Sequence, residues 1–211
     1  MRYMNGKEEI PMSLVWNQMK AGNEQGLSDL FTRLYPDLYL YGMKIFNLPD
    51  LVKDSIQDVF VRVWEKRKTL GEVLNPKAYL ITALRRKLFE NKERYFAADA
   101  EILIKISEKQ AFSFVENEFT EIPEISEKLR ESLIATINDL PERQRELVFL
   151  RFYYNLKYRE IADILNVKEQ TVKNLMQRTM GSLSSKLDRK QWERMDDLDG
   201  LLFTFFVFVK K

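Results

Sequence analysis

Apolar residues recur along most of the chain at three- and four-residue steps, the spacing of one face of an α-helix. Over residues 11–46 this pattern predicts two helices with a break at the Gly-Asn pair of residues 22–23. A third helix is expected over residues 51–68, after Leu-Pro-Asp, and a fourth over residues 77–94. The first part of the chain is therefore expected to be entirely helical.

The periodicity fades between residues 97 and 124, where acidic side chains stand among apolar ones. Such a stretch is typical of a connector without a packed core. The helical pattern returns at residue 125 and continues to about residue 190. We therefore expect an all-α fold in which two small helical domains, residues 1–96 and 125–190, are joined by a flexible acidic linker, residues 97–124, with residues 191–211 as an apolar tail.

Residues 158–177 read YREIADILNVKEQTVKNLMQ and predict two short helices folded against each other. Ala162 is small enough for two helices to cross closely, and Asn166 tolerates a left-handed turn better than most residues. Lys168 lacks the side-chain oxygen preferred at a helix N-cap. The alternative is a helical hairpin that packs only on its own core. Such a hairpin would have Ala, a turn residue and Val at the positions that a helix-turn-helix requires only by accident. We favour a helix-turn-helix, whose second helix enters the DNA major groove.

The outward side of this second helix carries amide, hydroxyl and charged side chains. Amides suit adenine, and basic side chains suit guanine or phosphate. The candidate DNA contacts are Glu169, Gln170, Thr171, Lys173, Asn174, Gln177 and Arg178.

The amino-acid composition excludes several classes of function. The 211 residues are 45% hydrophobic, which is enough for real cores, and include no Cys and no His. Disulfides, thiol nucleophiles, zinc fingers and imidazole bases are thereby excluded. Paired carboxylates, a glycine-rich loop or a nucleophile constellation do not stand out, so we expect no catalytic residue, metal, cofactor or small-molecule substrate. The first residues lack the apolar core of a secretory signal, so a cytoplasmic location is expected.

The net charge of +2 hides a strong division along the chain. Residues 53–94 carry a net +5, residues 95–127 a net −6, and residues 128–194 again a net +5. Attraction to phosphate follows the local patch and not the total. The basic helix expected over residues 77–94 also carries aromatic rings, which could stack on unpaired bases. Buried aromatics with solubilising charges are the alternative.

Four segments carry a resemblance to a known family. The carboxyl-terminal one is LPERQRELVFLRFYYNLKYREIADILNVKEQTVKNLMQRTMGSL, and the amino-terminal ones are GNEQGLSDLFTRLYPDLY, DSIQDVFVRVWEK and NPKAYLITALRRKLFENKER. Together, over about residues 14–187, they resemble a bacterial RNA polymerase sigma factor of the sigma-70 family, extracytoplasmic-function (ECF) subfamily. The resemblance implies three kinds of partner, which are the bacterial RNA polymerase core, double-stranded and melted promoter DNA, and an anti-sigma factor, because the family often pairs with one.

The resemblance also assigns residues to surfaces. The helix-turn-helix would read the minus-thirty-five element, and a flipped base would be captured near residues 68–76. The connector would lie in positively charged polymerase channels and mimic RNA. The expected polymerase contacts are Asp54, Gln57, Asp58, Phe60 and Trp64. The expected minus-ten contacts are Lys68, Tyr79, Arg85, Arg86, Lys87 and Lys92.

The sequence leaves one alternative function open. An ordinary helix-turn-helix regulator would bind a two-fold DNA site without polymerase.

The tail segment of residues 201–209, LLFTFFVFV, is too short to span a membrane, which takes about 20 residues. Its composition suits a strand or an aggregation-prone segment. We favour its burial against one of the two domains over a docking site for a regulator or the membrane.

Overall fold

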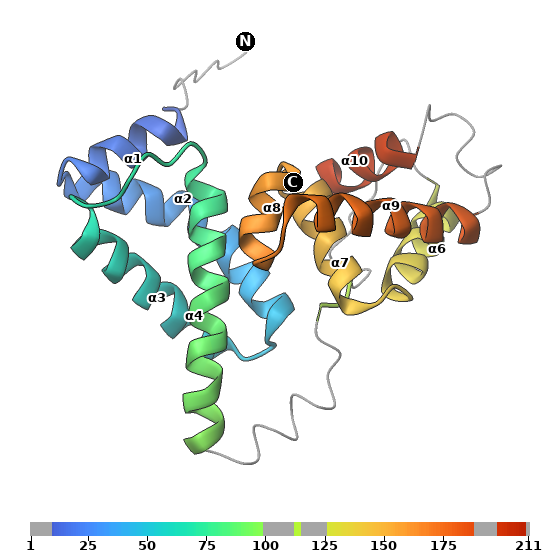
Figure 1. The fold of residues 1–211 in the computed structure, drawn as a ribbon, viewed down its shortest axis with the longest axis horizontal. Helices are drawn as coiled ribbons and strands as arrows, with labels where there is room; N and C mark the ends of the chain where they lie inside the picture. Colours follow the sequence, from blue (N-terminus) through green and yellow to red (C-terminus); the bar gives the residue numbers. More distant parts are fainter. Residues whose placement is uncertain (1–9, 99–111, 115–125, 188–197, 210–211) are drawn as a thin grey trace, which may run out of the picture. The chain divides into compact units, whose positions relative to one another are not determined.

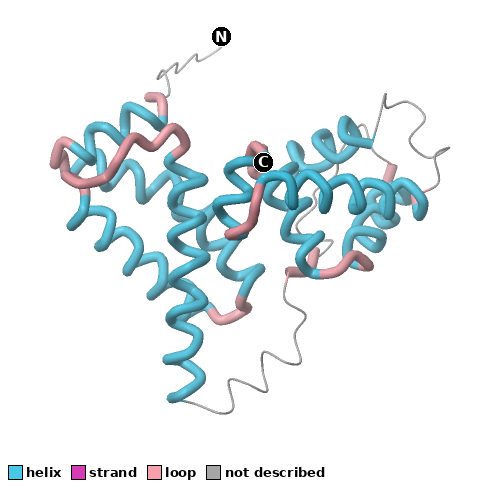
Figure 2. The backbone as a smooth tube through the Cα atoms, viewed as in Figure 1, coloured by secondary structure: helices cyan, strands magenta, loops and turns pink. Residues whose placement is uncertain are grey.

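The computed structural model describes residues 10–98, 112–114, 126–187 and 198–209. Within these residues every regular element is a helix (Figure 2), which confirms the predicted all-α fold. The chain divides into two compact units, residues 1–104 and 105–211. Most of the predicted linker, residues 99–111 and 115–124, lies outside the described residues.

The first unit is a bundle of four helices (Figure 1): α1 (Met12–Lys20), α2 (Glu24–Ile45), α3 (Pro49–Lys66) and α4 (Pro76–Ala98). The break predicted at residues 22–23 is confirmed. Gly22 has φ +89°, which a glycine adopts without strain. The Oδ1 of Asn23 then accepts the backbone N–H of Gln25 at 2.9 Å and caps α2.

Two glycines let the helices of this unit approach closely. A Cβ placed on Gly42 of α2 would lie 2.6 Å from Val52 Cγ1 of α3, and one on Gly26 would lie 2.7 Å from the backbone nitrogen of Met19 in α1. Both distances are shorter than real Cβ contacts. Glycine is therefore required at these crossings for space.

The second unit contains α6 (Glu127–Asn138), α7 (Glu142–Val148), the π-helical turn η2 (Phe149–Tyr153), α8 (Tyr158–Leu165), α9 (Glu169–Lys186) and α10 (Leu198–Val209). Its core is built from apolar side chains of these elements together with residues 112 and 114. The large fully buried ones include Phe112 and Phe149.

The tail forms helix α10, so the expectation of a strand was wrong. Leu198, Leu201 and Leu202 are spaced to share one helix face, and all three are buried. Phe203 packs edge-on against Phe152 of η2 at 4.9 Å between ring centroids. A helix satisfies its backbone internally, whereas a strand would need a sheet edge to pair with, and the described part of this unit offers none. The preferred prediction, burial against one of the domains, is confirmed. None of the described helices has the length and apolar character required to cross a membrane.

Candidate nucleic-acid interface

The α8–turn–α9 segment has the geometry of a helix-turn-helix. Asn166 adopts the left-handed conformation, φ 54° and ψ 51°, as predicted for the turn. The backbone N–H of Val167 donates to Ala162 O at 3.0 Å, and Ala162 is buried. At the other end of α8, the Glu160 side chain accepts the backbone N–H of Lys157 at 2.7 Å. Helix α8 is therefore capped at both ends, and its second cap forms the turn into α9.

The candidate contact residues lie along the outer side of α9. Glu169 is half-buried, and the other six are exposed: Gln170, Thr171, Lys173, Asn174, Gln177 and Arg178. Val172 and Met176 point the other way, into the core. The structure thus brings the seven candidates together on one helix.

Two contacts order these exposed side chains. Gln170 Nε2 donates to Asn174 Oδ1 at 2.9 Å, and Lys173 Nζ lies 2.7 Å from Glu169 Oε1. Lys168 stands at the N-cap and, as expected, its side chain makes no capping hydrogen bond. The positive end of α9 can therefore attract a phosphate, which favours docking of this end on a DNA backbone.

Basic and aromatic side chains combine on α4. The guanidinium of Arg85 lies 4.9 Å from the centre of the Phe89 ring, and Lys92 Nζ lies 5.0 Å from that of Phe46. Phe46 and Phe89 meet edge-on at 5.2 Å. Phe89 is 42% exposed, so this cluster offers cations beside an accessible ring. The sequence alone did not predict that Arg85 contacts Phe89 or that Lys92 contacts Phe46.

The loop before α4 is held at two points. Lys20 Nζ donates to Gly71 O at 3.0 Å, and Asn75 Oδ1 accepts the backbone N–H of Ala78, which caps α4. Between these anchors Leu74 is 87% exposed. The resemblance placed a base pocket near residues 68–76, but nothing in the sequence singled out Leu74 over the neighbouring apolar residue Val73.

The remaining minus-ten candidates differ in exposure. Lys68 and Arg86 are exposed, whereas Lys87 is half-buried. Tyr79 is half-buried and meets the ring of Trp16 edge-on at 5.3 Å. Tyr79 is therefore partly occupied with packing α4 onto α1.

The polymerase candidates on α3 separate into two groups. Asp54, Gln57 and Asp58 are exposed, and Trp64 is half-buried with the Arg67 guanidinium 4.1 Å from its ring centre. Phe60 is only 6% exposed and packs edge-on against Phe31 at 5.0 Å. Phe60 lies in the core of the bundle and not on the exposed side of α3.

Asp58 and Lys87 were assigned to different surfaces, yet they contact each other. Lys87 Nζ lies 3.1 Å from Asp58 Oδ2. Asn91 Nδ2 donates to the same carboxylate at 3.3 Å and to Ser55 Oγ at 3.1 Å. Ser55 and Asn91 are buried, so these four side chains form a polar bridge between α3 and α4.

Fold and surface together define an all-helical DNA-binding protein with a helix-turn-helix. Among the residues that the structure describes, no group of three or more His, Cys, Asp or Glu side chains could hold a metal ion. The family model "Sigma-70 region 2" matches residues 30–94, and "Sigma-70, region 4" matches residues 130–183. Together they cover more than half of the chain, which therefore belongs to the sigma-70 family of transcription initiation factors. Regions 2 and 4 are the two that the ECF subfamily retains, in agreement with the resemblance found in the sequence.

Solved structures show the same fold. One is "CnrH in complex with the cytosolic domain of CnrY", with 18% identity over 82% of this chain and 94% of that chain, at a TM-score of 0.53. Another is "the sigma factor RpoE in complex with the anti-sigma factor NepR from Bartonella quintana", with 20% identity over 75% of this chain and 94% of that chain, at a TM-score of 0.51. No match was found among curated proteins.

Proposed function

We propose that this sigma factor brings bacterial core RNA polymerase to promoters with two elements and helps to melt the downstream one. The observation that carries the proposal is that two separately folded units, one per matched region, each present a helix with accessible cationic and polar side chains. A DNA-reading helix on a region 4 unit and a basic helix on a region 2 unit suit one protein that contacts a promoter at two points.

The region 4 unit would read the minus-thirty-five element as duplex DNA. Gln170, Asn174 and Gln177 can reach base edges, because amides pair with adenine in the major groove. Lys173 and Arg178 suit guanine or phosphate. The hydrogen bond between Gln170 and Asn174 supports a shared role, since it holds the two amides ready on one side of α9.

The region 2 unit would melt and hold the minus-ten element. Arg85, Arg86 and Lys92 supply positive charge along α4, and Phe89 supplies an accessible ring beside them. A base leaving the stack costs a few kcal/mol, which stacking and pocket contacts offset. The loop anchored by Lys20 and carrying exposed Leu74 is the candidate pocket for that base. Lys68 and Tyr79 would border it.

Polymerase would dock on the exposed side of α3, through Asp54, Gln57 and Asp58. Trp64 would extend that surface, and Phe60 would support it from the core through Phe31. An anti-sigma factor is a further proposed partner, because both structural relatives described above were solved with a bound protein and one of these is named as an anti-sigma factor.

The decisive experiment is run-off transcription with sigma-free bacterial core polymerase on a library of promoters. We expect transcripts from templates that share an upstream and a downstream element, and none without the protein. Binding to a two-fold site with no capture of polymerase would contradict the proposal and support the regulator. The match to region 2 over residues 30–94 favours the sigma factor.

The first prediction concerns α9. Lys173→Glu should lower transcription from a matching promoter about tenfold, because one contact in the major groove is worth roughly 1–3 kcal/mol. Capture of core polymerase in a pull-down should not change, since the capture surface is on α3. Lys128→Glu makes the same charge change at an exposed position of α6 and should retain full transcription. Full transcription by the Lys173 variant would rule out this role of α9.

A further inference from the structure

Residues 112–114, which we call the aromatic clip, are held in the second unit by the side chain of Asn138, the last residue of α6. Asn138 Nδ2 donates to Phe114 O at 2.7 Å, and the Phe114 N–H donates to Asn138 Oδ1 at 2.8 Å. One primary amide thus pairs with both backbone polar groups of a single residue, as an adjacent strand would do. This contact fixes the orientation of the clip as well as its position.

The two aromatic side chains of the clip complete the core of the unit. Phe112 and Phe114 are 1% and 2% exposed. Their ring centroids lie 5.4 and 6.1 Å from that of Phe149 in η2. Because η2 leads directly into the turn before α8, the clip packs beneath the element that supports the helix-turn-helix.

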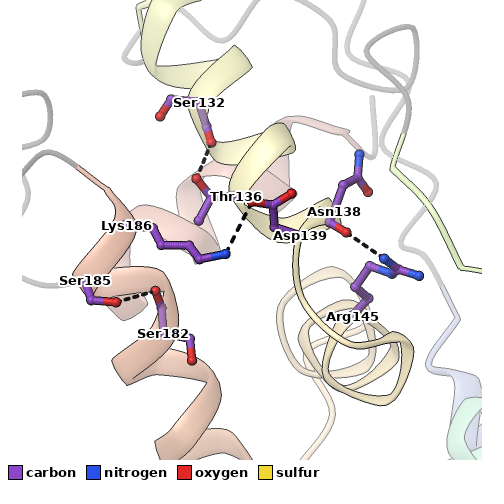
Figure 3. A network of polar contacts seen from close by, with 8 residues as sticks. All are labelled: Ser132, Thr136, Asn138, Asp139, Arg145, Ser182, Ser185 and Lys186. Atoms are coloured by element: carbon purple, nitrogen blue, oxygen red, sulfur yellow. Dashed lines mark hydrogen bonds and ion pairs between the residues drawn. The ribbon is translucent and has the colours of Figure 1, made fainter.

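The receiving side of the contact is itself fixed. Arg145 Nη1 of α7 donates to the backbone oxygen of Asn138 at 2.6 Å, and Lys186 of α9 lies 3.3 Å from Asp139 Oδ2. Figure 3 shows the Asn138 amide directed away from Arg145 and so available to Phe114. Phe112 has φ +57°, a region that aromatic residues rarely occupy. Such a conformation persists where the surrounding contacts determine it.

We propose that the clip is a positioning element that sets how far apart the two promoter elements can lie, an inference that rests on the proposed function. With Phe112 held, the connector that begins after α4 ends at residue 111. Without the clip it would continue to Ser126, the N-cap of α6. An extended chain spans at most about 3.5 Å per residue, so release roughly doubles the reach of the connector. Each base pair of promoter spacing adds about 3.4 Å, and Asn138 thereby limits the spacings that both units can satisfy together.

The physical state of the clip is tested by hydrogen exchange on the full chain. Asn138→Ala removes the acceptor of the Phe114 N–H, so that amide should exchange at least tenfold faster than in the wild type. Amides of α9 should keep their protection, which shows that the unit remains folded. Glu131→Gln, at an exposed position of the same helix, should leave the Phe114 amide protected. Unchanged protection in the Asn138 variant would overturn the role of Asn138.

The functional consequence is tested by transcription from promoters that differ only in spacing. The wild type should prefer one spacing over a spacing two base pairs longer. In the Asn138→Ala protein that preference should fall towards equal use of the two spacings, because a connector of about twice the reach can satisfy the longer spacing as well as the shorter one. Glu131→Gln should keep the wild-type preference.

Two transcription results would overturn the inference. An unchanged preference despite a released clip would do so, and so would an equal loss at every spacing, which marks a merely structural role. Absence of transcription by the wild type would instead overturn the proposed function. The exchange measurement would still report whether Asn138 holds the clip, so the two failures can be told apart.

Discussion

The side chain of Asp58 meets both solvent and polar side chains of α4. Its carboxylate faces solvent with 47% of the side chain exposed, yet it lies 3.1 Å from Lys87 Nζ and also accepts from Asn91. An ion pair this exposed is partly screened and contributes on the order of 0.2–1 kcal/mol. A substitution at Asp58 therefore alters the packing of α3 on α4 as well as any contact with polymerase.

Gln57 separates these two effects. Gln57→Arg places a positive charge on the exposed side of α3 and should weaken capture of core polymerase in a pull-down, because that side is proposed to meet basic residues. The free energy of unfolding should change by less than about 0.5 kcal/mol, as is usual at surface positions.

Asp58→Arg should weaken capture too, but it should also lower the unfolding free energy, by roughly 1 kcal/mol, because Lys87 would then face a like charge. Chemical denaturation measures both unfolding free energies. Normal capture by both variants would show that this side of α3 does not bind polymerase.

Residues with a local signal were predictable, and residues in long-range pairs were not. Asn166 follows from the apolar residues on either side of it and from its tolerance of a left-handed turn. The contact between Asn138 and Phe114 joins residues 24 positions apart, and that between Asn91 and Asp58 joins residues 33 apart. Helix periodicity places each of these side chains on a face, but it does not say which side chain lies opposite.

At the scale of the elements, the crossing of α2 and α3 leaves no room for a side chain at Gly42. Gly42→Ala would place a methyl group 2.6 Å from Val52 Cγ1, so the helices must separate. Overpacking of this kind costs about 1–3 kcal/mol, which thermal or urea unfolding of the first unit would detect.

Gly181→Ala is the matched control, since nothing lies within 4 Å of its Cβ. In an exposed helix alanine is favoured over glycine, so this variant should be neutral or more stable by up to about 1 kcal/mol. Equal effects of the two substitutions would contradict the steric account.

Helix α10 is part of the second unit, because its leucines are buried there. Leu202 is 0% exposed, and Leu202→Ala should lower the unfolding free energy of this unit by about 2–4 kcal/mol through lost burial and a cavity. Leu14→Ala, at a 48% exposed position of α1, should have little effect. Unchanged stability of the Leu202 variant would mean that α10 does not pack as described.

Helix positions were predictable because three- and four-residue steps are a strong local signal over long segments. The helix expected over residues 51–68 is α3, Pro49–Lys66, and the one expected over residues 77–94 is α4, Pro76–Ala98. The prediction of a strand at residues 201–209 was wrong because a short apolar run suits a strand and a buried helix equally well. Its true state depends on η2, against which it packs, and no local pattern reveals that neighbour.

At the scale of the whole molecule, the two compact units should unfold separately. Scanning calorimetry of the full chain should resolve two transitions, because each unit has its own core. Gly42→Ala should lower the temperature of one transition and Leu202→Ala that of the other. A single transition shifted by both variants would mean that the units fold as one.

The polar bridge between α3 and α4 has a thermodynamic consequence if Asp58 binds polymerase, as proposed, and Lys87 binds promoter DNA, as the resemblance implies. A basic polymerase residue that pairs with Asp58 competes with Lys87 for the same carboxylate, and a released Lys87 can then bind a DNA phosphate. Linkage is reciprocal, so promoter DNA that draws Lys87 away would tighten the hold of Asp58 on polymerase by the same factor. A single, partly exposed ion pair would in this way make polymerase and promoter cooperative ligands of one small helical bundle.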